Sequence, residues 1–136
     1  MELVKTRHCL VMVPKGKYFL GDPCYAVPDR HWMNLLTSCD FFRDTPIGEV
    51  DGHKVLGFST AHGDGCYEDQ FENEYPVDAG MIGLVPEALI DMEEFIANYP
   101  NGLPGIWVKF DYDTFAETDG MTLSFGKHRI NTNNND

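Results

Sequence analysis

The chain has 136 residues, of which 43% are hydrophobic, and it carries a formal net charge of −12 at pH 7. This length and apolar content suit one folded domain that buries roughly two-thirds of its unfolded surface, which excludes a wholly disordered chain. The surface has 22 carboxylates against ten lysines and arginines, so we expect basic proteins or cationic ligands as partners and no nucleic acid.

Short strands and one helix are expected in the first part of the chain. Apolar runs at residues 10–13 and 18–20 predict strands, because Pro and Gly turn residues bound them. Residues 25–27 are expected to be extended beyond a turn. A helix then begins with Asp29 as its N-cap and ends near residues 38–40. Its apolar face contains Trp32, Leu35 and Leu36.

The middle of the chain predicts a hairpin and a glycine-rich strand. Residues 48–50 and 53–56 flank Asp51-Gly52, a pair that suits the two-residue primed turn of a β-hairpin. Residues 77–85 mix glycines with apolar residues, which predicts a strand where another backbone or a ligand approaches closely.

A second helix and two further strands are expected after this segment. Pro86 suits the first position of the helix, and the helix ends before Gly102. Residues 106–113 and 121–125 alternate apolar and polar side chains, which predicts half-buried strands. We expect one core that contains Trp32, Leu89, Met92, Phe95, Ile96, Val108 and Phe110.

These elements predict an α+β fold. Strands outnumber helices and are joined by turns, which favours a mainly antiparallel sheet with two packed helices; a sheet curled into a partial barrel is the alternative. Residues 1–130 are expected to form a single globular domain. Residues 131–136 are nearly all Asn and are expected to be a disordered tail.

The compartment and the cofactors are predicted from what the sequence lacks. No apolar run approaches the roughly 20 residues of a membrane span, and residues 1–5 lack the apolar region of a signal peptide. We therefore expect a cytoplasmic protein with no membrane partner and with reduced cysteines. The cysteines form no C-x-x-C pair, so no metal and no other cofactor is predicted.

A repeated pentapeptide is the most distinctive motif. Gly21-Asp22-Pro23-Cys24-Tyr25 returns as Gly63-Asp64-Gly65-Cys66-Tyr67. Each copy combines a glycine, an Asp that can bond its own turn and a small thiol, which predicts a tight turn. We expect the copies at adjacent strand ends, where Asp22 and Asp64 accept backbone hydrogen bonds. The two thiols are then small buried groups.

Two chemical interpretations of the repeat remain open beside this structural one. If the copies converge, Cys66, His62 and Asp64 have the residue types of a nucleophile, its base and an orienting carboxylate. Alternatively, the region contacts a ligand or a partner. The candidate contact residues are Asp22, Cys24, Tyr25, His62, Asp64, Cys66, Tyr67, Phe71 and Asp78, and none is assigned as catalytic.

An acidic segment with regularly spaced aromatic residues follows the second copy. Tyr67, Phe71 and Tyr75 lie four residues apart among Glu68, Asp69, Glu72 and Glu74. The rings could anchor a basic partner inside a negative field, or they could pack back onto the sheet. Metal binding by these carboxylates is disfavoured, because the segment lacks the pattern of an EF-hand loop.

Two blocks of sequence resemble a known group of proteins. The first is residues 18–25 with Pro28 and Trp32, and the second is residues 59–67 with 77–80 and 82–83. They resemble small uncharacterised proteins of tailed phages and bacteria, which implies a phage or mobile-element setting and no assigned activity. We therefore expect a non-enzymatic acidic protein that binds a host protein or a small ligand in the host cytoplasm. The alternative is a small enzyme that uses Cys, Asp and His near the repeat.

Overall fold

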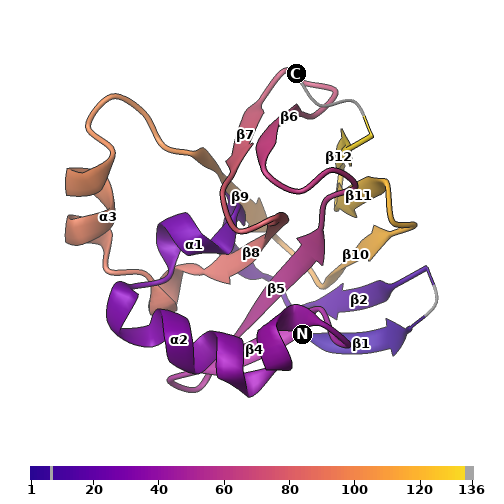
Figure 1. Ribbon diagram of the computed structural model, residues 1–136, viewed down its shortest axis with the longest axis horizontal. Coiled ribbons are helices and arrows are strands. Elements are labelled where there is room, and N and C mark those ends of the chain that lie inside the picture. The colour runs from indigo at the N-terminus through magenta and orange to yellow at the C-terminus, as the bar shows by residue number, and fades with distance from the viewer. Residues whose placement is uncertain (7, 134–136) are drawn as a thin grey trace.

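The computed structural model describes residues 1–6 and 8–133 and has an α+β fold (Figure 1). Within this part of the chain, twelve strands pair antiparallel in three sheets that do not close into a barrel, and two main helices pack on them. The expected α+β fold with two packed helices is confirmed. In the described part no helix has the length and apolarity needed to cross a membrane.

The first sheet joins the two ends of the chain. Its strand order is β1-β2-β10-β11-β12. The strands are β1 (Glu2–Lys5), β2 (Leu10–Val13), β10 (Thr114–Thr118), β11 (Thr122–Phe125) and β12 (His128–Asn131). Because β2 pairs with β10, the N-terminal hairpin and the C-terminal strands form one layer.

The second sheet is the centre of the molecule and has the order β4-β5-β8-β3-β9. Its strands are β3 (Gly16–Gly21), β4 (Ile47–Val50), β5 (His53–Ser59), β8 (Met81–Pro86) and β9 (Gly105–Phe110). The hairpin of β4 and β5 turns at Asp51 and Gly52, with φ of 51° and 77°, so the predicted primed turn is confirmed. β9 is the last strand of this sheet.

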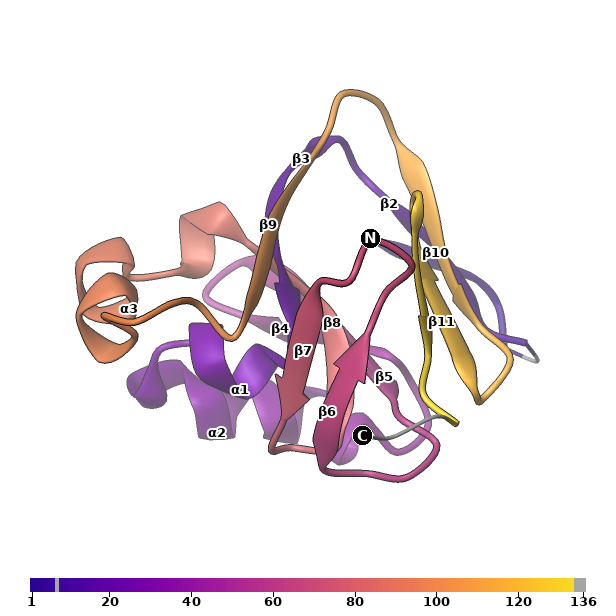
Figure 2. The ribbon, with the colours of Figure 1, turned by 90° about the horizontal axis from the view of Figure 1, so that it is seen from above.

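The third sheet is a separate hairpin of β6 (Gly65–Glu68) and β7 (Glu74–Val77). Figure 2 shows the two large sheets diverging from each other, with this hairpin across the opening. β6 lies beside β12, where Asp69 forms an isolated bridge with Ile130, and β7 lies beside β9.

Helices cover one face of the central sheet only. They are α1 (Pro23–Ala26), α2 (Asp29–Ser38) and α3 (Met92–Asn98), with single 3-10 turns η1 (Asp40–Phe42) and η2 (Glu87–Leu89). Leu35 of α2 and Phe95 of α3 are their most deeply buried large side chains. Since successive strand residues point to opposite faces, β3 sends Phe19 toward the helices and Leu20 toward the other sheet.

Four glycines form a row across the central sheet, at positions where a Cβ would meet neighbouring atoms closely. Gly57, Gly83, Gly21 and Gly105 are cross-strand partners on neighbouring strands. They lie on the same face as Phe19, where α1 contacts β3, β5 and β8. A Cβ on Gly83 would overlap the carbonyl of Leu56. The close backbone approach predicted from the glycine-rich segment is therefore confirmed at this residue.

Several sequence predictions need correction. Residues 25–27 are not all extended, because Asp22 caps α1 and Pro23 occupies its first turn. Pro86 ends β8, and the second helix begins only after Asp91, whose side chain accepts from the amide of Glu94. Residues 77–85 are divided by a turn at 78–80 between β7 and β8.

The single expected core is two cores on opposite faces of the central sheet. Val108 belongs to the layer between the two large sheets, whereas Leu89 and Phe95 belong to the layer under the helices. Ile96 lies in neither layer, since 57% of it is exposed. A strand that is buried on both faces contributes to two layers, which a count of apolar residues along the chain does not reveal.

Ordered structure continues beyond residue 130, the expected end of the domain. β12 runs to Asn131, and Thr132 is fully buried. The Thr132 hydroxyl accepts from the amide of Ala61 at 2.9 Å and donates to the carbonyl of Met121. Residues 134–136 of the expected tail lie outside the described residues.

Candidate functional site

The first copy of the pentapeptide forms a buried link between two loops. Asp22 is fully buried, and its Oδ1 accepts from the amide of Cys24 at 3.0 Å. Its Oδ2 accepts from the amides of Asp78 and Ala79 at 2.9 and 2.7 Å. The in-turn bond predicted for Asp22 is confirmed, and the carboxylate also attaches α1 to the turn between β7 and β8.

The environment of Cys24 opposes a role as a nucleophile. Burial raises the pKa of the Cys24 thiol, and the neighbouring charge of Asp22 raises it further. The reactive species of a cysteine is the thiolate, which such a thiol does not form at neutral pH. The same causes, burial first and then the charge of Asp78, raise the pKa of Tyr25.

The second copy has a different structure. Gly65 begins β6, whereas Pro23 at the same position of the first copy starts a helix. Asp64 is exposed at the surface, and the Nε2 atom of His62 lies 3.1 Å from Oδ1 of Asn133. The copies therefore do not end adjacent strands of one sheet as expected, although Gly65 pairs with Val77, the residue before the loop that Asp22 holds.

A small cavity lies beside the first copy, between α1 and α3. Its lining includes Cys24, Tyr25 and Tyr99, together with carboxylates of Asp29, Asp91 and Glu94. The rings of Tyr25 and Tyr99 pack edge to face, with their centroids 5.9 Å apart. A volume of about 70 Å³ leaves room for only a few water-sized groups, so this cavity does not enclose a metabolite.

The aromatic side chains of the β6–β7 hairpin divide between interior and surface. Tyr67 and Tyr75 are cross-strand partners and are buried in the core between the sheets. The Tyr67 hydroxyl donates to the carbonyl of Gly63 at 2.8 Å. The prediction that both tyrosines anchor a partner is therefore wrong, and the alternative, that they pack inward, is confirmed. Phe71 alone of the three is exposed, by 53%.

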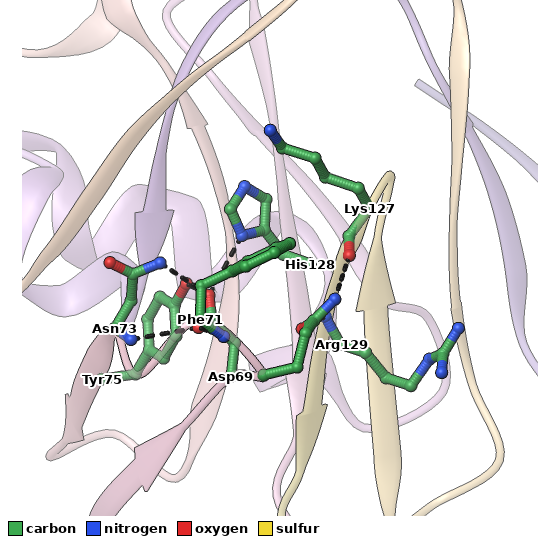
Figure 3. A network of polar contacts seen from close by, with 8 residues as sticks. Asp69, Phe71, Asn73, Tyr75, Lys127, His128 and Arg129 are labelled. Atoms are coloured by element: carbon green, nitrogen blue, oxygen red, sulfur yellow. Dashed lines mark hydrogen bonds and ion pairs between the residues drawn. The ribbon is translucent and has the colours of Figure 1, made fainter.

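Asp69 is buried at the start of the loop that joins β6 to β7, so this carboxylate is not solvated as an acidic surface loop would be (Figure 3). Oδ1 accepts from the amides of Phe71 and Asn73 at 2.9 and 3.0 Å. Oδ2 lies 2.9 Å from the side-chain Nδ2 of Asn73, 2.7 Å from the Tyr75 hydroxyl and 3.0 Å from Nδ1 of His128. Burial alone would raise the pKa of Asp69, but hydrogen bonds from Asn73, Tyr75 and His128 outweigh it and lower the pKa to about 2.

The neighbouring Gln70 attaches the same loop to β12. Its side-chain nitrogen donates to the carbonyl of Lys127, and its side-chain oxygen accepts from the backbone amide of Arg129 at 2.8 Å. Together with the bridge between Asp69 and Ile130, these bonds hold the hairpin against the edge of the first sheet. These contacts between the β6–β7 loop and β12 could not be predicted from the sequence, since no local signal relates residues 69–70 to 127–130.

A groove of about 570 Å³ runs along β9 and reaches the turn between β11 and β12. We call it the β9 groove. It is lined by residues 106–112, Thr114, Gly126, Lys127 and His128. The Phe110 ring approaches Gly126 closely, since a Cβ there would lie 3.0 Å from the ring. Because β9 ends its sheet, its outer edge has no strand partner among the described residues.

The charge of the β9 groove differs from that of the whole chain. Lys109 and Lys127 are exposed in its lining, which also includes the buried His128, whereas Asp111 is its one carboxylate among the described residues. The groove thus contains two of the ten lysines and arginines but one of the 22 acidic residues. Its local charge favours anionic groups.

Exposed aromatic rings gather at one end of the β9 groove. The Phe71 ring lies 5.7 Å from Nζ of Lys127. Tyr112 and Phe115, which are 77% and 55% exposed, line an adjoining cavity with Lys127. Sequence reasoning included Phe71 as a candidate and missed the other two, because their proximity depends on how β10 and β12 pair with β11.

The arrangement is suited to binding. The described residues contain no group of three or more His, Cys, Asp or Glu side chains placed to hold a metal ion. The β9 groove instead combines an open strand edge, two lysines and exposed rings.

In comparisons with known proteins, the chain matches no family model, no curated protein sequence and no solved structure. The resemblance to small phage and bacterial proteins therefore stays a prediction.

Proposed function

We propose that this chain is a non-enzymatic binding protein that holds a segment of a partner protein in the β9 groove. One observation carries the proposal. Phe71, Tyr112 and Phe115 are exposed around Lys127, beside a strand edge that has no strand partner in the described part of the chain. Protein interfaces are enriched in aromatic side chains, and such rings supply much of the binding energy.

The polar groups of the molecule support binding rather than catalysis. Within the described part, every buried side-chain nitrogen or oxygen has a hydrogen-bond partner. Asp22 accepts hydrogen bonds from three backbone amides, and Asp69 accepts one from His128. The thiol of Cys24 has a raised pKa. These groups stabilise loops, and this role leaves them poorly placed for proton transfer or nucleophilic attack.

The shape of the groove favours a protein segment over a small metabolite. β9 spans six residues, which corresponds to roughly 20 Å of extended chain. Sites for small molecules are usually enclosed by apolar side chains, whereas Lys109, Asp111 and Tyr112 are exposed along this groove. In the phage or mobile-element setting that the resemblance implies, the segment belongs to a host protein.

The test is selection of ligands from a displayed library of random linear peptides on the immobilised full-length protein. We expect enriched peptides that protect the amides of β9 from hydrogen exchange and bind less tightly to a Tyr112→Ala, Phe115→Ala variant. The matched control is Met33→Ala, which truncates an exposed apolar side chain on α2. Failure to enrich any peptide over the bare support, or protection confined to other segments, would overturn the proposal.

A further inference from the structure

We propose that the occupant of the β9 groove is an acidic segment in extended conformation that adds to the central sheet as a sixth strand beside β9. This inference rests on the function proposed above and specifies the chemistry of the partner. It follows from three features of the groove, namely its backbone edge, its charge and its side-chain pattern.

The backbone edge supplies the first argument. β9 pairs with β3 from Gly105 to Phe110, and it is the last strand of the order β4-β5-β8-β3-β9. A strand edge presents a row of amide and carbonyl groups that an extended peptide can pair with, whatever its sequence. The lining of the groove follows β9 from Ile106 to Phe110 and continues to Tyr112.

Charge supplies the second argument. Lys109 lies on β9, and Lys127 lies on the opposite wall at the turn before β12. An acidic segment in the groove has the opposite charge to both lysines, whereas a basic segment has the same charge. A lysine on an edge strand also discourages pairing with neutral apolar strands, so it selects among possible partners.

The alternation of side chains supplies the third argument. Trp107 and Lys109 share one face of β9, whereas Val108 and Phe110 point to the other face, toward the core between the sheets. A strand added to β9 continues this alternation. We therefore expect acidic residues on the side of Lys109 and apolar residues on the side of Phe110.

A second copy of the chain is a weaker occupant of the same edge. Pairing of two β9 strands would bring two Lys109 side chains onto neighbouring strands. Like charges on paired strands are destabilising. Dimer formation is therefore an outcome that the experiment must detect.

The experiment uses fluorescent peptides of about ten residues, long enough to cover β9, with the full-length protein. One peptide alternates Glu and Val, and the other alternates Lys and Val. We expect anisotropy titrations to show binding of the Glu/Val peptide only. A Lys109→Glu, Lys127→Glu variant should lose roughly tenfold or more in affinity. The matched control is Lys5→Glu on β1, at the far end of the other sheet, which should leave affinity unchanged.

Backbone N-methylation tests the strand geometry directly. Alternate amides of an extended peptide point to the same edge, so methylating one alternate set should abolish binding and methylating the other set should not. Equal effects of the two sets, equal binding of the Lys/Val peptide, or no change in the double lysine variant would each overturn strand addition by an acidic segment. Both lysines are exposed, and an unchanged melting temperature would confirm that the variant is folded.

The failures of the two proposals are distinguishable. If library peptides protect β9 but are basic or insensitive to N-methylation, the proposed function stands and the acidic-strand inference is wrong. If no library peptide binds, both are wrong. If sedimentation shows a dimer whose β9 amides are protected without any peptide, a second copy is the occupant and the inference is overturned.

Discussion

The carboxylate of Asp69 accepts hydrogen bonds from two backbone amides and from the side chains of Asn73, Tyr75 and His128. An ionised carboxylate can only accept, so Nδ1 of His128 must carry a proton. The donors come from the β6–β7 loop, β7 and β12. One residue therefore fixes the position of the loop that presents Phe71 beside the β9 groove.

Replacing Asp69 with Asn should lower the free energy of unfolding by about 3 kcal/mol, because one amide oxygen cannot replace two carboxylate oxygens for five donors. Urea denaturation measures the loss. The matched control is Glu68→Gln on β6, which neutralises an exposed carboxylate of the same hairpin and should have no measurable effect. Equal stability of the two variants would contradict the structural role of Asp69.

Asp69 should also make the free energy of unfolding depend on pH in the acid range. Its pKa falls from an ordinary 3.8 to about 2 on folding, so the folded state favours the charged form. A group with a lowered pKa contributes its full stability above pH 4 and loses that contribution as the pH falls toward 2. The amount is on the order of 2 kcal/mol. Urea unfolding at several pH values should show the difference between wild type and Asp69→Asn shrinking over this range, and a constant difference would contradict it.

The two Asp residues of the repeated pentapeptide should differ sharply in their effect on stability. Asp22→Ala leaves the amides of Cys24, Asp78 and Ala79 without an acceptor in a buried site, at a cost of about 3 kcal/mol. Asp64→Ala at the equivalent position of the second copy should cause no measurable change, since Asp64 is exposed. Thermal unfolding compares the pair, and similar losses would show that the two copies have the same role after all.

At the scale of elements, α3 attaches to the central sheet through one residue above all. Phe95 is buried and packs edge to face against Phe19 and Trp107, with ring centroids 5.2 and 6.0 Å apart. Phe95→Ala should cost about 3–5 kcal/mol through lost burial and the cavity left behind. Ile96→Ala, on the next residue of the helix, should have little effect because Ile96 is exposed. Denaturant midpoints test both, and a wild-type midpoint for Phe95→Ala would indicate that α3 does not pack as described.

The elements that sequence predicted well are those with a local signal. The Asp51-Gly52 turn and the amphipathic α2 each depend on neighbouring residues only. The start of α1 also had such a signal, since Asp22-Pro23 is a typical N-cap and first-turn pair, but it was interpreted as a turn. The start of α3 had a similar one in Asp91, three residues before Glu94.

The missed elements have patterns that tertiary contacts override. In β10 the large apolar Phe115 is exposed and the small Ala116 is buried. The apolarity of the side chains therefore does not indicate which face of this strand is buried. In β12, His128 is buried, and its Nδ1 atom donates a hydrogen bond to Asp69 in the loop between β6 and β7. The β9 groove could not be predicted at all, since it requires the register of β9 on β3 and the position of the β11–β12 turn.

At the scale of the whole molecule, the pairing of distant segments should make folding slow. β2 pairs with β10 and β3 pairs with β9, so two long-range pairings must form before either core is closed. Proteins dominated by such contacts fold in milliseconds to seconds rather than microseconds. Stopped-flow refolding monitored by the fluorescence of the two tryptophans, Trp32 and Trp107, measures this rate. A refolding phase complete within about a millisecond would contradict the expectation.

The joining of both chain ends in the first sheet has a consequence during protein synthesis. Val13 on β2 pairs with Thr114 on β10, about 100 residues later, so a ribosome adding 5–20 residues per second leaves β2 unpaired on that side for roughly 5–20 s. Throughout this interval the nascent chain exposes Val11 and Val13, which are fully buried in the finished protein. Chaperones that bind apolar strands would therefore meet β2 before β10 is made, and release from them would coincide with the emergence of β10.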